Sequence, residues 1–143
     1  MSVEENKALI RRQFEDWSSL GGNVSKIRVI MDAYVAPRYI YHGGAHSQLN
    51  REQALEGMVA MLSALPDFRM SIHDQLAEGD MVATRYTWQG THRGTFMGIA
   101  ATGRQIVVKG IEINRIAEGK VVETWDFLDS MDLMTQLGIV PKA

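Results

Sequence analysis

The residues best suited to chemistry are two acids and a threonine near the C-terminal end, Glu112, Thr124 and Asp126. They lie in residues 105–129, QIVVKGIEINRIAEGKVVETWDFLD, a pattern typical of two β-branched strands joined by a tight turn. If residues 117–119 form a three-residue loop, Gly119 supplies the positive φ that its third position requires.

The geometry of this hairpin decides whether the acids meet. With the three-residue loop, Glu112 lies opposite Thr124 and Asp126 lies opposite Gly110, so both acids share one sheet face as diagonal neighbours. A two-residue turn at Glu118-Gly119 would instead place the acids on opposite faces. Any shared function of the two carboxyls therefore depends on which turn forms.

Two carboxyls close together in an apolar site cannot both ionise at low cost, because burial and like-charge repulsion raise a pKa. One acid can then act as a base while the other, still protonated, donates a hydrogen bond to a developing oxyanion. We assign the base to Asp126 and the neutral donor to Glu112. The alternative for Glu112 is a structural salt bridge, for instance with Arg85 or Arg104.

The four histidines are further candidates. His42 ends a short strand and faces either a pocket or the surface. His92, in GTHRG, is expected to tie a long connection to a backbone group, with a pocket role as the alternative. His46 and His73 are predicted to be loop or surface residues. No third ligand accompanies His42 and His46, so we predict no metal site.

Aromatic residues could line a pocket and stack on a flat substrate. Trp17, Tyr86 and Trp88 are the candidates, and their alternative role is plain apolar core. The nine methionines suit an adaptable cavity as well as they suit ordinary core.

Composition indicates one globular domain over residues 1–143, with 45% hydrophobic and 22% charged residues. A net charge of −2 favours neither nucleic acid nor an anionic membrane as a partner. The absence of cysteine excludes disulfides and thiolate chemistry. No apolar run approaches the ~18 residues of a membrane span, and we expect a cytoplasmic protein.

The order of periodic segments predicts an α+β fold. Helices are expected from Ser2, from about Ser25 to just before Pro37, and from Asn50 to Pro66, and alternating strands follow from Phe68. The helices should cover one face of a curved antiparallel sheet. Both faces of the 105–129 hairpin carry apolar residues, which suggests that a second subunit covers the other face.

Several segments carry a recognisable family pattern: ENKALIRRQF, YIYHGG, LPDFRMSI, AEGDMVATRYTWQGTHRGTFMGIAATGRQI, GIEINRIAEGKVVETWD and QLGIVP. In these segments the chain resembles the SnoaL-like polyketide cyclases, which have the nuclear-transport-factor and ketosteroid-isomerase fold. The resemblance covers nearly the whole chain. It implies a cone-shaped, bent antiparallel sheet closed by three N-terminal helices around an apolar pocket. It also implies a homodimer and an enzyme without a cofactor.

The resemblance further implies roles for single residues. Asp126, in the motif ETWD, matches the family's general base, which removes a C–H proton next to carbonyl groups so that the enolate closes a ring. Glu112 stands where the family has a substrate-binding histidine, and Phe14 stands where it has a tyrosine. The position of His42 often faces the pocket in this family.

The leading hypothesis is a cyclase or isomerase that acts on a small apolar or polyketide-like carbonyl compound, with Asp126 and Glu112 as catalytic residues. The candidate substrate-binding residues are His42, Phe14, Trp17, Tyr86, Trp88, His92 and Thr124. One alternative is an epoxide-hydrolase-like enzyme that uses Asp126, Arg85 and Glu112. Another is a non-catalytic domain of the same fold that binds a small molecule or dimerises.

Overall fold

The computed structural model describes residues 1–43 and 48–139. The helical segments are α1 (Val3–Ser18), the 3₁₀ helix η1 (Val24–Lys26), α2 (Ile27–Tyr34), α3 (Arg51–Ala64) and α4 (Ser130–Leu137). The strands are β1 (Val35–Gly43), β2 (Gln48–Asn50), β3 (Arg69–Glu78), β4 (Met81–Thr91), β5 (Gln105–Ala117) and β6 (Lys120–Leu128). His46, predicted to be a loop or surface residue, lies outside the described residues.

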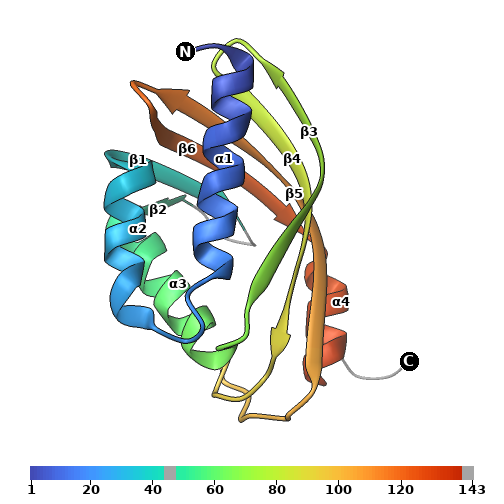
Figure 1. Ribbon diagram of the computed structural model, residues 1–143. Coiled ribbons are helices and arrows are strands. Elements are labelled where there is room, and N and C mark those ends of the chain that lie inside the picture. Colours follow the sequence, from blue (N-terminus) through green and yellow to red (C-terminus); the bar gives the residue numbers. More distant parts are fainter. Residues whose placement is uncertain (44–47, 140–143) are drawn as a thin grey trace.

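The strands form one sheet in the order β2-β1-β6-β5-β4-β3. The sheet bends strongly, and α1, α2 and α3 cover its concave face (Figure 1). This arrangement confirms the predicted α+β class with three N-terminal helices packed on a curved sheet. The sheet is mixed, however, because β1 runs parallel to β6 while all other neighbours are antiparallel. Neither this parallel pair nor the short β2 was predicted.

Local capping explains where the helices begin. The Ser2 hydroxyl accepts a hydrogen bond from the Glu5 amide at 3.1 Å, and Asn50 and Gln53 form the complete reciprocal capping box at α3. Helix α2 ends at Tyr34, earlier than predicted. The reason is tertiary, since the next residue, Val35, already pairs with β6.

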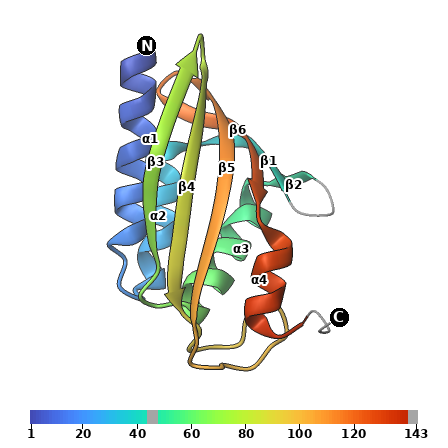
Figure 2. The same cartoon turned by 90° about the vertical axis from the view of Figure 1, so that its right-hand side faces the viewer.

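The pairing of β6 with β5 ends at Leu128, and helix α4 lies beside the remaining part of β5 (Figure 2). The Gln136 side chain accepts a hydrogen bond from the Val107 amide at 2.8 Å and donates one to the Val107 carbonyl at 2.7 Å. A side-chain amide therefore stands in for the missing strand and protects an exposed sheet edge. Within residues 1–43 and 48–139, no helix combines the length and apolar character needed to cross a membrane.

The β5–β6 hairpin corrects the predicted three-residue loop. Ala117 pairs with Lys120, so the turn contains only Glu118 and Gly119, with φ of 53° and 76°. Two positive φ values are typical of a type I′ turn, whose twist matches that of the flanking strands. This two-residue turn alone would have placed the two acids on opposite faces.

A β-bulge at Val122 returns the two acids to the same face of the sheet. Ile116 pairs with Val121 but Arg115 pairs with Glu123, so Val122 is an extra residue in β6. The extra residue shifts the alternation by one position beyond Val121, which pairs with Ile116.

Beyond the bulge, Glu112 pairs directly with Asp126 and Asn114 pairs with Thr124. The predicted shared face is retained, but the acids are directly opposed rather than diagonal.

The backbone conformation of this turn can be tested by substitution at Glu118. Glu118 is not a glycine yet has a positive φ, a conformation that costs most L-residues about 1 kcal/mol or more. Asparagine tolerates this region and is preferred before glycine in such turns. Glu118→Asn should therefore raise the free energy of unfolding by about 0.5–1 kcal/mol in urea titrations. Glu118→Ala removes the same charge and should give no gain; equal gains from both variants would contradict a backbone origin.

Candidate functional site

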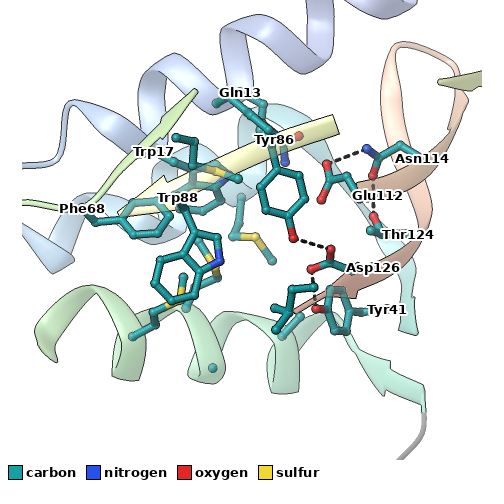
Figure 3. Close-up of a pocket in the computed structure, with 18 of the residues that line it drawn as sticks. Gln13, Trp17, Tyr41, Phe68, Tyr86, Trp88, Glu112, Asn114, Thr124 and Asp126 are labelled. Atoms are coloured by element: carbon teal, nitrogen blue, oxygen red, sulfur yellow. Dashed lines mark hydrogen bonds between the residues drawn. The ribbon is translucent and has the colours of Figure 1, made fainter. Parts of the chain in front are cut away.

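A cavity of about 300 Å³ lies between the helices and the concave face of the sheet. Its apolar lining consists of Phe14, Trp17, Met31, Leu49, Ala54, Gly57, Met58, Met61, Phe68, Met70, Trp88, Phe96 and Leu128. Its polar lining consists of Gln13, Tyr39, Tyr41, Tyr86, Glu112, Asn114, Thr124 and Asp126. Most of the polar groups gather on the side formed by β1, β5 and β6, across from the two tryptophans (Figure 3).

Both oxygens of Asp126 accept a hydrogen bond from a phenol. The Tyr86 hydroxyl of β4 donates to Oδ1 at 2.6 Å, and the Tyr41 hydroxyl of β1 donates to Oδ2 at 2.8 Å. Hydrogen bonds to an ionised carboxylate are stronger than those between neutral groups. The two tyrosines therefore favour the charged form of Asp126.

Glu112 belongs to a separate hydrogen-bond chain. The Asn114 side-chain amide donates to Glu112 Oε1 at 2.8 Å, and the Thr124 hydroxyl donates to Asn114 Oδ1 at 2.6 Å. Both hydrogen bonds are visible beside Asp126 in Figure 3. Glu112 thus receives one neutral donor where Asp126 receives two, so the two carboxyls are chemically unequal.

The electrostatics follow from burial. Burial first, and the charge of Asp126 second, raise the pKa of Glu112 to about 8. Burial also raises the pKa of Asp126, and the hydrogen bonds from Tyr86 and Tyr41 oppose this rise. Of the pair, Glu112 is therefore the acid that holds a proton near neutral pH. Burial and the Asp126 charge also raise the pKa values of Tyr41 and Tyr86, which keeps both phenols protonated as donors.

Most of the candidate binding residues line the cavity. Phe14, Trp17, Tyr86, Trp88 and Thr124 all do so, together with both acids. Phe14 packs edge-on against Tyr86 with ring centroids 6.0 Å apart. Tyr86, considered for stacking, has a different contact as well, because its hydroxyl is bonded to Asp126.

His42 lies on the other face of the sheet. Successive side chains of a strand point to opposite faces, so His42 points outward because Tyr41 faces the cavity. Its ring stacks on Trp125 at 5.2 Å, and its Nε2 lies 2.6 Å from Glu123. The structure therefore corrects the placement of His42 in the pocket.

His92 is not among the cavity residues either. Its ring is fully buried, with Nδ1 3.0 Å from the Thr102 hydroxyl. Its backbone amide donates to the Arg104 carbonyl at 2.8 Å, and its carbonyl accepts from Gly103 at 2.9 Å. These contacts tie the connection between β4 and β5 together, as expected for this residue, although the imidazole contacts a side-chain hydroxyl rather than a backbone group.

The arginines proposed as partners of Glu112 lie elsewhere. Arg85 faces outward and pairs with Asp74 at 2.6 Å, and Arg104 donates to the Gln136 carbonyl at 3.2 Å. An acid–arginine–acid set for epoxide hydrolysis is therefore not assembled from Arg85. Among the described residues, no cluster of three or more histidines, cysteines or acids is arranged to hold a metal ion.

The sequence interpretation missed four polar residues that line the cavity, Gln13, Tyr39, Tyr41 and Asn114. Alternation within YIYH places Tyr39 and Tyr41 on one face of a strand. That signal could have identified both as inward residues, but not the contact with Asp126, which is 85 positions away in sequence. Gln13 lies beside Phe14 on α1, and no sequence pattern distinguishes it from a surface residue.

The chain is similar to known proteins along most of its length. The sequence model of a family described as SnoaL-like polyketide cyclase matches residues 22–137. AclR from Streptomyces galilaeus, a candidate hydroxylase, is similar in structure with a TM-score of 0.85 and 29% identity, over 98% of this chain and 100% of AclR. IdmH from Streptomyces antibioticus, a candidate polyketide cyclase, has a TM-score of 0.76 and 27% identity, over 93% of this chain and 98% of IdmH.

A candidate SnoaL-like polyketide cyclase from Jannaschia sp. CCS1 has a TM-score of 0.81 at 21% identity, over 96% of this chain and 94% of that protein. At this identity the likeness concerns the fold alone. No curated protein matches the chain.

The raised pKa of Glu112 predicts a pH dependence of stability. Between the ordinary value of 4.5 and about 8 the folded state retains a proton that the unfolded state releases. The free energy of unfolding should therefore fall as pH rises through this window, by on the order of 1.4 kcal/mol per pH unit for one proton. Glu112→Gln should flatten this slope in urea titrations at pH 5 to 8. The exposed Glu56→Gln control should retain it, and equal slopes for wild type and Glu112→Gln would contradict the assignment.

Proposed function

Because the chain belongs to the SnoaL-like polyketide cyclase family, we propose that it is a cofactor-free enzyme that removes a proton next to a carbonyl group. The observation that carries this proposal is the unequal carboxyl pair in an apolar cavity. Asp126 has two phenol donors and Glu112 has one amide donor. Such an environment separates the protonation states of two acids, as acid–base catalysis requires.

In the proposed reaction, ionised Asp126 takes the proton from a carbon between or beside carbonyl groups. The electrons of that C–H bond form a C=C bond to the carbonyl carbon, while the π electrons of the C=O bond move to the oxygen. Protonated Glu112 donates a hydrogen bond to the enolate oxygen that forms. The enolate carbon then attacks a second carbonyl carbon and closes a ring, or it is reprotonated at another carbon. Asp126 returns the proton to the product and is regenerated.

The lining of the cavity indicates the class of substrate. Among the described residues that line it, the only carboxyl groups are those of Glu112 and Asp126, and none of these residues is a lysine, arginine or histidine. An anionic substrate would enter without a counter-charge and would face two acids, which is costly in an apolar site. We therefore propose an uncharged carbonyl compound, with Trp17 and Trp88 packing against its flat apolar part.

The principal alternative is a binding protein that uses the same cavity without catalysis. The apolar lining favours this role as much as it favours an enzyme, since most ligand sites are apolar with a few polar groups. The two proposals differ in one measurable respect. An enzyme exchanges the acidic C–H protons of a bound carbonyl compound with solvent, whereas a binding protein does not.

Hydrogen–deuterium exchange tests the proposed reaction. Uncharged aryl 1,3-diketones in D₂O should exchange their C–H protons faster with the protein than without it, as followed by proton NMR. Asp126→Asn should slow the catalysed exchange by about 10²–10⁴-fold, because a general base contributes a factor of that size. Glu112→Gln should have a smaller effect, since its amide can still donate a hydrogen bond.

The matched control for this experiment is Asp74→Asn. Asp74 is an acid on the outward face of the sheet, paired with Arg85, and its replacement should leave the exchange rate unchanged. Full activity of a folded Asp126→Asn variant would refute the role of Asp126. Binding of the diketones without catalysed exchange would favour the binding protein.

We also propose a homodimer that forms through the outer face, the sheet surface opposite the cavity. Ile111 and Phe127 pair in register on this face and are 48% and 72% exposed. Exposed apolar residues gathered on one face are typical of an interaction surface. A second copy of the chain is the proposed occupant, in keeping with the dimer that the family resemblance implies.

Light scattering tests the dimer. The wild-type chain should have twice its monomer mass of 16.0 kDa. Phe127→Glu should give the monomer mass, because a carboxylate would be buried without a partner in the interface. Val29→Glu introduces the same charge at an exposed apolar residue of α2 and should remain dimeric. A monomeric wild type would refute the proposal.

A further inference from the structure

Two glycines lie against the two phenols that reach Asp126. Gly43, the last residue of β1, pairs in register with Asp126, and Gly110 of β5 pairs with Tyr86. A Cβ atom at Gly43 would lie 2.6 Å from the Tyr41 hydroxyl oxygen, and one at Gly110 would lie 2.5 Å from the Tyr86 hydroxyl oxygen. Both distances are far below the ~3.5–4.0 Å of favourable atom contacts.

Each tyrosine side chain therefore passes close to a glycine where it reaches the Asp126 carboxylate. The hydroxyls that occupy this space are the same ones that donate to Oδ2 and Oδ1 of Asp126. Neither glycine has a positive φ, so the backbone itself would accept alanine at both positions. Glycine matters at these two positions because any side chain would overlap the tyrosine hydroxyl.

The two positions differ in one respect. At Gly43 all three nearest atoms belong to the Tyr41 side chain, which can move away from a methyl group. At Gly110 the carbonyl oxygen of Phe127 also lies 3.1 Å from the Cβ position. Alanine at Gly43 is therefore the cleaner way to displace a phenol while leaving that phenol in the protein.

We propose that Gly43 and Gly110 are positioning residues for the base, each keeping open the space through which one tyrosine hydroxyl reaches Asp126. The proposal deepens the function proposed above, in which Asp126 is the base. With both hydroxyls in place, each carboxylate oxygen retains an acceptor site for the proton of a substrate. The glycines thus act on the reaction through the tyrosines and touch no reacting atom.

Among the residues that the structure describes, the titratable groups that face Asp126 come from the sheet. They are Tyr39 and Tyr41 of β1, Tyr86 of β4 and Glu112 of β5, and the lining residues from α1, α2 and α3 include no titratable side chain. Loss of one phenol donor disfavours the charged form of Asp126 and so raises its pKa. The displacement of a tyrosine should therefore be measurable as a titration in the free protein.

The experiment uses protein labelled with ¹³C at the aspartate and glutamate carboxyl carbons, titrated by NMR without any ligand. The Asp126 signal is identified by its loss in Asp126→Asn. Gly43→Ala should raise the apparent pKa of Asp126 by about one pH unit, and Tyr41→Phe should raise it equally, because both remove the same hydrogen bond. The double variant Gly43→Ala/Tyr41→Phe should show no further shift.

Gly110→Ala with Tyr86→Phe forms a second series with the same expected relation. If Gly110→Ala fails to fold because of the nearby Phe127 carbonyl, the Gly43 series decides alone. Gly57→Ala is the matched control. It also adds a methyl group to the cavity lining, but nothing lies within 4 Å of its Cβ position, and it should leave the titration of Asp126 unmoved.

Two results would overturn the proposal. One is a folded Gly43→Ala protein whose Asp126 titrates as in the wild type. The other is a shift from Gly43→Ala that persists in full when Tyr41 is already phenylalanine. Neither result depends on turnover, so a protein without catalysed proton exchange would refute the enzymatic role and leave the role of the glycines standing.

Discussion

The constraint on which the rest of the site depends is the cost of placing two carboxyls face to face in an apolar cavity. Glu112 and Asp126 pair across β5 and β6 with little else around them to carry charge. Burial and mutual repulsion make a doubly ionised pair unfavourable, so one proton is retained. The neighbouring hydrogen bonds then decide which carboxyl retains it.

Among the described residues, the donors of those hydrogen bonds all come from the sheet. Tyr41 and Tyr86 donate hydrogen bonds to Asp126. Asn114 donates one to Glu112 and accepts one from Thr124. The helices contribute apolar side chains and a single amide to the cavity. The sheet therefore supplies the hydrogen bonds to the acids, while the helices add to their burial and shape the space for a ligand.

The polar groups of this site differ from those that the family resemblance implies. The family resemblance implies that Glu112 stands at the position of a histidine and Phe14 at that of a tyrosine, so we expect the polar groups of this site to be arranged differently from those of the cyclases. In the proposed reaction, a protonated carboxyl replaces an imidazole as the donor to the enolate. The hydroxyls of Tyr41 and Tyr86 both contact Asp126, the proposed base. A shared fold thus leaves the chemistry to the local arrangement of donors.

The sequence by itself determined what depends on short-range physics. Capping residues and apolar periodicity identified α1, α3 and the alternating strands, and period two identified Glu112 and Asp126 as acids of one hairpin. Only the tertiary structure decided their register, because a bulge at Val122 compensates for a turn one residue shorter than predicted. The same holds for Tyr41 and His42, whose directions follow from the pairing of β1 with a strand about 80 residues away. No local pattern encodes such a pairing, since it forms between segments that the chain brings together only when it folds.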